Sequence, residues 1–590
     1  IVAAVLISMF VSFTLDPMLS SVWHDPAIDR EGQPFVPRTW YDHSLGRLTH
    51  WVDRLSHHLG DGYVAALGWS LRHKALTLLG AVATLVASLA LVPLLGTEFV
   101  PKADFSETSV NFYTPVGTPL EVTEARARQV DAILREMPEV RYTVTTINTG
   151  TAQGRNYASV FVRLVERRER TRNAEQMSVP LREQLSRVAG ITVTHVGLLD
   201  PVGGQKPISV SIQGPDIPTL QRLTTELTAR LARVPGLVDL DTSMKAPKPT
   251  VAVQVRRESA SGLGLSVGSI TQVLRGLVAG QTVGDWRAPD DQSYDVKVRL
   301  APDERDDPAQ LGRLGIATGT QADGTPRIVR LSQVAEVQLS TTASQVNRRD
   351  LSREVEITAS PSGRALGEVS ADIRRVLEST ALPPGYTYRF GGSTKDMQES
   401  FVYAVSALAL GVVFIYMILA SQFRSFLQPL ALMTSLPLTL IGVVAALLVW
   451  RSTLNMFSII GIVMLMGLVT KNAILLIDFA IRSRADGMSR HDALLHAAKV
   501  RLRPILMTTL AMIFGMLPLA FALSEGSEQR APMGQAVIGG VITSSVLTLV
   551  VVPVIYCWLD DLGQWARRLV RPSAAPKPLA GGTPEGASSP

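Results

Sequence analysis

The stretch GLVTKNAILLIDFA, Gly467 to Ala480, places a lysine about mid-way along an apolar run that extends from Met456 to Ile481. A helix that crosses a bilayer needs about 20 predominantly apolar residues, so this run is long enough to span one. Lys471 then lies near the bilayer midplane, where insertion scales give a cost of roughly 2.5 to 3.5 kcal/mol. The run therefore predicts a spanning helix whose lysine faces the interior of a helix bundle and meets an anion there.

Further apolar runs of spanning length occur on both sides of this one. Five lie near residues 74–96, 401–420, 427–450, 505–523 and 535–558, and residues 1–15 look like the end of another. Arg and Lys concentrate in the connections 21–74 and 482–503 and in the tail, which are cytoplasmic by the positive-inside rule. We therefore expect an α-helical polytopic membrane bundle, with six full spans plus the tail of one, and residues 97–396 outside the cytoplasm.

Composition narrows the class of protein. The chain has 590 residues, of which 46% are hydrophobic, and a formal net charge of +6. Its basic residues are spread among loops, so membrane topology explains them better than nucleic-acid binding does. A single cysteine, Cys557, leaves no disulfide or cysteine metal site within the chain. The sequence has no signal peptide and opens inside an apolar segment, so we interpret it as part of a longer protein.

The segment 97–396 has the pattern of a large α+β domain. Strand, helix and strand alternate twice in its first part, with helices from about Thr118 and over 173–188, which predicts a ferredoxin-like subdomain of βαβ repeats. Thr118 as N-cap and Glu121 at N3 predict a capping box for the first helix. The pattern returns with helices near 218–233 and 365–380. It is interrupted by a small mixed α+β module, with one helix near 266–279 and short strands, of which RIVRLSQVAEVQL is the last.

Lys471 invites two interpretations. It is either a structural counter-ion between two helices or a member of a proton relay, because intramembrane ionisable groups are functional candidates by default. Asp478 lies on nearly the same helix face, but seven residues of helix rise are about 10 Å, which is too far for one ion pair. We therefore expect the partner carboxylate of Lys471 to come from outside this helix, in a missing part of the protein or in another chain.

Polar residues of the next span extend this candidate site. Thr508 offers a hydroxyl either to a buried polar path or to its own helix backbone. Arg501 lies at the membrane edge, where anchoring is the alternative role. Outside the membrane the sequence has no nucleophile elbow, HExxH, Walker A or dinucleotide fingerprint, which argues against an enzyme.

The spans now described resemble those of resistance-nodulation-division (RND) inner-membrane permeases of the hydrophobe/amphiphile drug-efflux type. GLVTKNAILLIDFA, RLRPILMTTLAMIFGMLPLA and GQAVIGGVITSSVLTLVVVPVIY look like that family's spans ten, eleven and twelve, and LISMFVSFTLDPML looks like the end of span six. The resemblance covers nearly the whole chain and matches only the C-terminal half of the family.

The resemblance implies a division of the chain into domains. The end of the sixth span is 1–20, a cytoplasmic connecting segment with an amphipathic helix is 21–73, and a spanning helix is 74–96. Residues 97–204 form one periplasmic porter subdomain, 205–249 and 346–396 form a second, and 250–345 form a docking subdomain. Five spanning helices occupy 397–560, and a largely disordered cytoplasmic tail occupies 561–590.

The resemblance also implies a mechanism and partners. Lys471 matches a lysine that pairs with two aspartates on span four, which this sequence lacks, and Thr508 and Arg501 match polar positions of the proton relay; we add Asp478 and Asn472 to this set. The implied activity is proton antiport in a bacterial inner membrane, driven by the proton gradient with no other cofactor. The implied partners are a periplasmic adaptor, an outer-membrane channel, membrane lipid and further subunits in a homotrimer or a trimer of related chains, with no nucleic acid.

Substrate-binding residues follow from the same resemblance. Tyr142 and Phe161 lie where drug pumps have aromatic pocket residues, although packing in the core of the βαβ unit is the alternative for both. Residues 149–156, with Gln153 and Arg155, match the flexible loop that divides the pockets of drug pumps, or form a plain surface connection. This loop lacks the phenylalanines that are usual there.

Two other functions compete with efflux of amphiphilic small molecules. A heavy-metal exporter of the same superfamily should show clustered Met, Cys or His ligands, whereas Met137, Met177 and Met244 are scattered. A non-transporting scaffold or truncated product should not need Lys471.

Overall fold

The computed structural model describes residues 2–22, 40–148, 154–198, 206–305, 307–320 and 323–570. The chain divides into two compact units, one made of Ile1–His73 and Leu475–Leu506 and the other of Lys74–Ile474 and Met507–Pro590. The first unit contains α1 (Val2–Val22), α2 (Trp40–Arg72) and parts of two longer helices, α15 (Met456–Ala485) and α16 (Arg490–Ala520). The tail from Pro572, which we expect to be disordered, lies outside the described residues.

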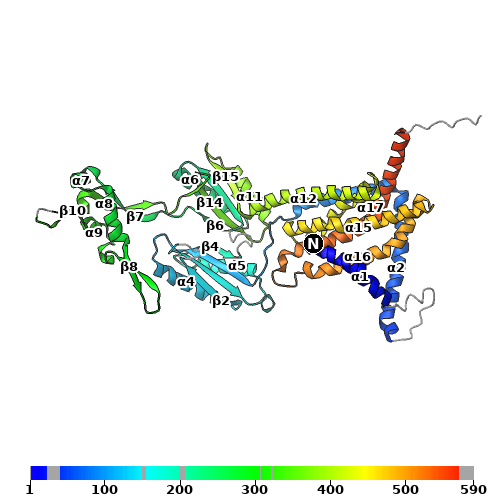
Figure 1. The fold of residues 1–590 in the computed structure, drawn as a ribbon, viewed down its shortest axis with the longest axis horizontal. Helices are drawn as coiled ribbons and strands as arrows, with labels where there is room; N and C mark the ends of the chain where they lie inside the picture. The colour runs from blue at the N-terminus through cyan, green and yellow to red at the C-terminus, as the bar shows by residue number, and fades with distance from the viewer. Residues whose placement is uncertain are drawn as a thin grey trace, which may run out of the picture. The chain divides into compact units, whose positions relative to one another are not determined.

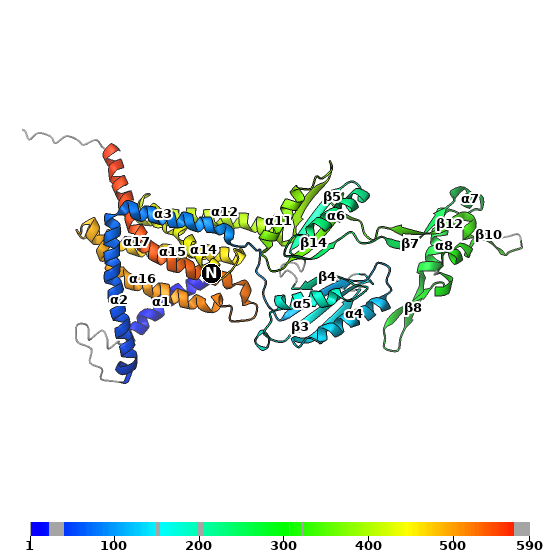
Figure 2. The same ribbon diagram turned by 180° about the vertical axis from the view of Figure 1, so that it is seen from behind.

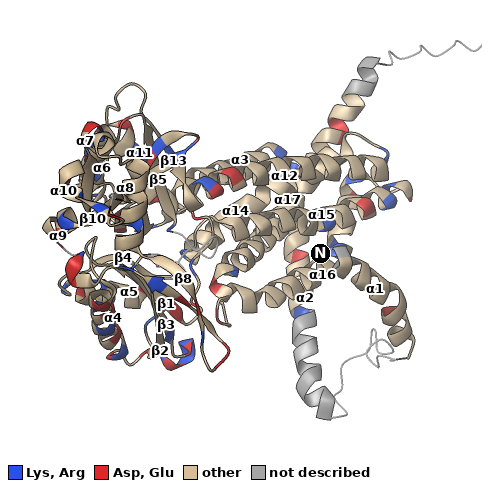
Figure 3. Ribbon diagram, turned by 60° about the vertical axis from the view of Figure 1, so that its left-hand side comes forward, with Lys and Arg blue, Asp and Glu red and all other residues tan. Residues whose placement is uncertain are grey.

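Within the described residues, six helical segments are long and apolar enough to cross a membrane. Besides α15 and α16, they are α3 (Lys74–Leu91), α12 (Gly392–Phe423), the consecutive helices α13 (Gln428–Met433) and α14 (Ser435–Val449), and α17 (Ala531–Val570). The run at 427–450 thus forms one candidate span, in which Thr434 lies between the two helices with a helical backbone. Figure 3 shows few charged residues along α3, α12, α14 and α17.

The helices α14 and α17 pack closely because each presents a glycine to the other. A Cβ placed on Gly442 would lie 2.0 Å from the backbone oxygen of Gly539, and one on Gly539 would lie 2.4 Å from the Cβ of Ala446. Small residues at such crossings let helix backbones approach, which is how membrane helices gain packing energy without a hydrophobic effect between them.

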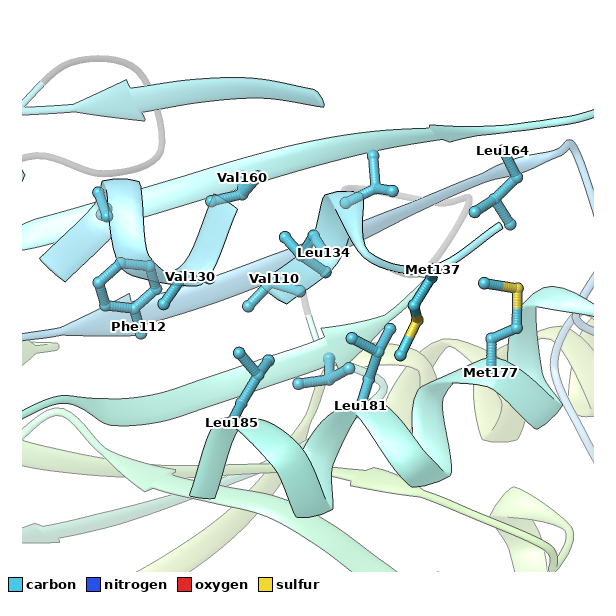
Figure 4. Close-up of a cluster of buried hydrophobic side chains, with 14 of the residues drawn as sticks. Val110, Phe112, Val130, Leu134, Met137, Val160, Leu164, Met177, Leu181 and Leu185 are labelled. Carbon is cyan, nitrogen blue, oxygen red and sulfur yellow. The ribbon is translucent and has the colours of Figure 1, made fainter. Parts of the chain in front are cut away.

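The segment after α3 forms a first sheet domain. Its chain order is β1 (Glu107–Tyr113), α4 (Leu120–Arg135), β2 (Val140–Ile147), β3 (Tyr157–Leu164), α5 (Ala174–Ser186) and β4 (Thr192–Gly197). The strands lie in the order β2-β3-β1-β4, and all three pairs are antiparallel. Alternate strand residues such as Val110, Phe112 and Val160 meet Leu134 and Leu181 of the two helices in a buried core (Figure 4).

A second sheet domain is built from two separated segments. Its elements are β5 (Ile208–Gly214), α6 (Ile217–Leu231), β6 (Leu237–Thr242), β13 (Asn347–Arg349), β14 (Ser352–Pro361), α11 (Leu366–Glu378) and β15 (Thr387–Gly391). The strand order is β13-β14-β5-β15, with β6 also paired to β14. The two helices α6 and α11 bury their apolar faces against Val210, Ile212 and Ile357 of the sheet.

The insert between these segments is carried by two long paired strands, β7 (Lys248–Val255) and β12 (Ala335–Thr342) (Figures 1 and 2). Its remaining elements are α7 (Arg257–Gly262), α8 (Val267–Leu274), β8 (Gln281–Arg287), β9 (Ser293–Val298), α9 (Pro308–Arg313), β10 (Gly315–Thr320), β11 (Pro326–Arg330) and α10 (Leu331–Val334). A small core that includes Ile270, Ile316 and Leu331 holds it together.

Two local predictions were wrong. The helix α4 begins at Leu120 after Pro119, and Thr118 donates its hydroxyl to the backbone oxygen of Pro115 instead of capping the helix. The stretch RIVRLSQVAEVQL is not one strand, because the helical turn α10 separates β11 from β12. The helix expected near 266–279 is present, because α8 ends at Leu274 and continues as one π-helical turn to Ala279.

Candidate transport site

The lysine of α15 has no partner in the described part of the chain. Its side chain is exposed, and no carboxylate or hydrogen-bond acceptor among the described residues lies within bonding distance of its ammonium. Its neighbours Thr470, Asn472 and Ala473 are buried, and Thr470 donates its hydroxyl to the backbone oxygen of Met466 at 2.9 Å. The helix thus packs one face and leaves Lys471 on another, where an acidic group from elsewhere can reach it.

The remaining charged relay candidates have other contacts. Asp478 forms an ion pair at 2.8 Å with Arg482, one turn further along the same helix. Arg501 places its guanidinium carbon 4.9 Å from the ring centre of Phe479, and its buried Nε has no acceptor among the described residues. The expectation that Asp478 does not serve Lys471 agrees with this pairing. The relay roles of Asp478, Asn472 and Arg501 stay predictions.

The helix α16 carries the candidate hydroxyl and a neighbour that the sequence did not single out. Thr508 is half-buried. The hydroxyl of the next residue, Thr509, lies 3.0 Å from that of Ser545 in α17, and both side chains are buried. A buried hydroxyl pair between two apolar helices is a polar contact that a single sequence cannot reveal, because Thr509 and Ser545 are far apart along the chain.

A cavity of about 530 Å³ lies among the two sheet domains and the segment that follows α3. Its wall contains the aromatic side chains Phe99, Phe105 and Phe161, with charged groups from Glu98 and Lys102. A mostly apolar pocket with a few polar groups is the usual form of a small-molecule site. An amphiphilic molecule could place its apolar part against the three rings.

Tyr142 and Phe161 lie on the open face of the first sheet. Val144 is the cross-strand partner of Phe161, so Tyr142, two residues from Val144 on β2, projects from the same face. Tyr142 is 50% exposed and Phe161 37% exposed, which excludes the alternative that they pack in the core. Arg155 is exposed, and Gln153 lies outside the described residues. The substrate-binding roles of these four residues stay predictions.

A buried carboxylate joins the two sheet domains. Asp239 of β6 accepts hydrogen bonds from Arg182 of α5, at 2.8 Å from Nε and 3.0 Å from Nη2, and from the backbone N–H of Val196 at 3.1 Å. His195 Nδ1 lies 3.4 Å away. The pairing of β6 with β14 shifts register around Asp239, whose φ of 55° is left-handed, and such bulges re-aim side chains.

We call the contact of Asp239 with Arg182, His195 and Val196 the Asp239 joint. The pKa values of Asp239 and of the neighbouring Lys206 follow from burial and hydrogen bonding. Burial alone would raise the pKa of Asp239, but the adjacent His195 ring and the hydrogen bonds and charge of Arg182 hold that pKa below its usual range. Lys206 donates to the backbone oxygen of Asp239 at 2.7 Å, and burial lowers the pKa of Lys206 to about 8. Sequence reasoning missed the joint because its members come from separate elements.

A short strap connects α15 to the sheet domains. Glu98 donates its backbone N–H to the oxygen of Leu454, and Leu454 donates to the oxygen of Gly96, so that residues 96–99 run beside the loop that precedes α15. The carboxylate of Glu98 accepts a hydrogen bond from the Thr453 hydroxyl at 3.2 Å, and burial raises its pKa. The strap also accepts a hydrogen bond at Thr97 from the first turn of α11.

The chain belongs to the AcrB/AcrD/AcrF family, whose model matches residues 1–560. It is 28% identical over 575 residues to the multidrug resistance protein MdtC of Cronobacter sakazakii, covering 96% of this chain and 54% of that protein. The MdtC of Klebsiella pneumoniae is also 28% identical, over 95% of this chain and 53% of its own length. The chain therefore spans about half the length of these curated relatives.

Solved structures agree on the family. A crystal structure of a heavy metal efflux pump superposes with a TM-score of 0.75 at 26% identity, over 85% of this chain and 52% of that one. A second crystal form of a heavy metal efflux pump gives a TM-score of 0.74. The chain has the RND permease fold, with several apolar helices and a sheet-rich domain, and is an inner-membrane protein of a transporter family rather than an enzyme.

Proposed function

We propose that this chain is the C-terminal half of an RND permease that exports amphiphilic small molecules at the expense of the proton gradient. The observation that carries the proposal is Lys471, a lysine within an apolar spanning helix whose ammonium has no acceptor among the described residues. Such a charge is retained where it serves ion or proton movement. The relatives named as multidrug resistance proteins support the substrate class.

The finer architecture belongs to the same proposal. We assign six full spans, with α1 as the end of another. The order β2-β3-β1-β4, with one helix after β1 and one after β3, supports a ferredoxin-like repeat for the first sheet domain. The two sheet domains would be porter subdomains, and 250–345 a docking subdomain. Assembly would follow the family: trimers, with an adaptor and an outer-membrane channel.

Protonation would act through the anion that Lys471 meets. When the partner carboxylates are charged, they attract the ammonium, and when they take up protons this attraction weakens. Helix α15 can then shift, and its strap at residues 96–99 moves with it because backbone hydrogen bonds join the two. The sheet domains would then adopt two conformations, and the cavity of about 530 Å³ would open in a different direction in each.

A heavy-metal exporter is the second candidate, favoured by the superposed efflux-pump structures. Against it, Met137 and Met177 are buried in the core of the first sheet domain, and Met244 packs against the core of the second. Met244 also borders a pocket of about 20 Å³, which lies in a different domain from Met137 and Met177. Among the described residues, no three His, Cys, Asp or Glu side chains are grouped to hold a metal ion.

The test uses the complete transporter that contains this chain, expressed in a strain without its own efflux pumps. Wild type should lower the accumulation of a cationic amphiphilic dye, and Lys471→Ala should abolish this effect at equal expression. The control Lys499→Ala changes an exposed lysine and should leave export intact. Dye export that survives Lys471→Ala contradicts the proton-relay role, and protection against zinc or copper salts without dye export favours the metal exporter.

A further inference from the structure

The loop between α16 and α17 is held at its base by the ends of three helices. Gln535, near the start of α17, donates its side-chain N–H to the backbone oxygen of Ala520, the last residue of α16, at 3.0 Å. The same amide accepts a hydrogen bond from the hydroxyl of Ser452, which follows α14. Gln535 is buried, with 5% of its surface exposed. A displacement of α16 is therefore passed to this loop.

The tip of the loop forms two hydrogen bonds and an ion pair with the first sheet domain. Glu525 accepts a hydrogen bond from the hydroxyl of Ser106 at 2.7 Å and another from the backbone N–H of Arg167 at 3.1 Å. The guanidinium of Arg167 pairs with Glu528 in the same loop. These bonds to Glu525 hold its pKa below the usual range, with the Ser106 bond as the largest cause. Two carboxylates thus bind two segments of one domain.

Between the two carboxylates, the backbone of the loop touches an aromatic ring. Gly526 has a φ of +73°, and a Cβ placed on it would lie 2.3 Å from a ring carbon of Phe105. Both the left-handed conformation and the close approach require glycine here. The ring of Phe105 is consequently in direct contact with the loop backbone.

Phe105 and Ser106 are themselves fixed to the first sheet domain. Ser106, whose φ of 55° is left-handed, accepts a hydrogen bond from the N–H of Leu164 in β3. The preceding Asp104 forms a buried ion pair with Arg170 and accepts the N–H of Ala174 at the start of α5. The segment 104–106 is therefore a rigid part of the domain and cannot absorb a movement of the loop on its own.

The same ring is part of the cavity wall. Phe105 lines the cavity of about 530 Å³ together with Phe99 and Phe161. The ring thus borders both the α16–α17 loop and the space that a ligand would fill. Filling the cavity and moving the loop thus act on one side chain.

We propose that Glu525, Gly526 and Glu528 form a coupling clamp, which makes the position of α16 and the occupancy of the cavity depend on each other. The clamp residues are positioning residues, because they act through Phe105 and Ser106. Since coupling between two sites is reciprocal, a ligand in the cavity should change the proton affinity of the membrane helices as protonation changes ligand affinity. This inference rests on the proposed function.

The test measures coupling separately from binding. The complete transporter is reconstituted in liposomes, and proton flux is recorded with and without a cationic amphiphilic dye, whose binding is measured by fluorescence anisotropy. Wild type should show dye-stimulated proton flux. Glu525→Ala and Ser106→Ala should each keep dye binding and basal flux but reduce the stimulation by roughly fivefold or more, the lower end of typical allosteric coupling. The double variant should lose little beyond Glu525→Ala alone, because the hydrogen bond that Ser106→Ala removes is already absent in Glu525→Ala.

Two matched controls isolate the clamp. Glu124→Ala removes an exposed carboxylate of α4 that, within the described part of the chain, pairs only with Arg128 on its own helix, and stimulation should stay at the wild-type value. Gly526→Ala places a methyl group against Phe105 and should abolish stimulation. Gly385→Ala has a comparable left-handed φ of +84° but meets nothing within 4 Å, so it reproduces the backbone strain without the contact.

The outcomes separate the clamp from the proposed function. Unchanged stimulation in Glu525→Ala, Ser106→Ala and Gly526→Ala overturns the clamp while efflux stands. Parallel loss of dye binding, basal flux and thermal stability shows a merely structural role and also overturns it. Absence of dye-stimulated flux in the wild type contradicts the proposed function itself, and the clamp with it.

Discussion

Two charged residues, Lys471 and Asp239, differ in whether the sequence alone reveals them. Lys471 could be found from sequence because an ammonium within an apolar run stands out against its neighbours. Asp239 could not be found, because its role depends on Arg182 and Val196, which reach it from another domain. Its left-handed backbone gives no sequence signal either, since aspartate is common in turns. The sequence thus predicts an isolated charge better than a paired one.

The joint around Asp239 predicts a measurable loss of stability. Asp239→Asn removes the charge that Arg182 binds in a bidentate manner, and hydrogen bonds to charged groups are worth about 1.5 to 3 kcal/mol. We expect the free energy of unfolding to fall by about this amount and the Val196 amide to exchange its hydrogen faster. Asp241→Asn changes a carboxylate on the same strand that is 22% exposed, against 4% for Asp239, so it should have a smaller effect. Equal effects of the two variants contradict the account.

Lys206 predicts a dependence of stability on pH. Burial lowers its folded pKa to about 8, whereas the unfolded chain has the ordinary lysine value of about 10.4. Between these two values the unfolded state binds more protons, so stability should rise as pH increases from about 8 towards 10. Thermal unfolding of the wild type and of Lys206→Met across this range tests the point: the rise attributable to Lys206 should be missing in the variant. An identical pH profile in both would show that the lysine is not desolvated.

Among the secondary-structure elements, the spanning helices could be predicted from the length of the apolar runs. The exact helix ends and the close contacts between elements could not. The spans around Lys471 and Thr508 were predictable because an apolar run of this length has few alternatives. The start of α4 was not, since Pro119 and Pro115 give Thr118 a competing turn. The strand pattern after Arg327 also hid α10, because four residues of apolar periodicity fit a strand and a helical turn equally.

The contact between α14 and α17 carries the prediction at this scale. Gly442→Ala would place a methyl group 2.0 Å from the backbone oxygen of Gly539, and overpacking of this kind typically costs about 1 to 3 kcal/mol. We expect a lower thermal unfolding temperature in detergent. Gly515→Ala in α16 is the matched control, since nothing lies within 4 Å of its added Cβ, and it should leave stability equal or slightly higher. A stable Gly442→Ala variant would mean that the two helices are not tightly packed.

For the whole molecule, two sheet domains, an inserted module and apolar helices form one fold shared with the AcrB/AcrD/AcrF family. The sequence indicated this organisation because strand and helix patterns recur between apolar runs. The membrane orientation that its Arg and Lys residues indicate stays a prediction. The joint at Asp239 and the clamp at Glu525 were beyond its reach, since both depend on contacts between domains. The sequence located Lys471. The structure added the contacts by which the α16–α17 loop joins the membrane helices to the domain that lines the cavity.

Lys471 is proposed to link proton movement to export, and transport under an imposed pH gradient shows whether it does. The complete transporter, in liposomes with an imposed pH gradient, is assayed for transport of a cationic amphiphilic dye together with the accompanying proton flux. Wild type should move dye only while the gradient lasts, and Lys471→Ala should move neither dye nor protons despite normal dye binding. Gradient-dependent dye transport by the Lys471→Ala protein would contradict the account.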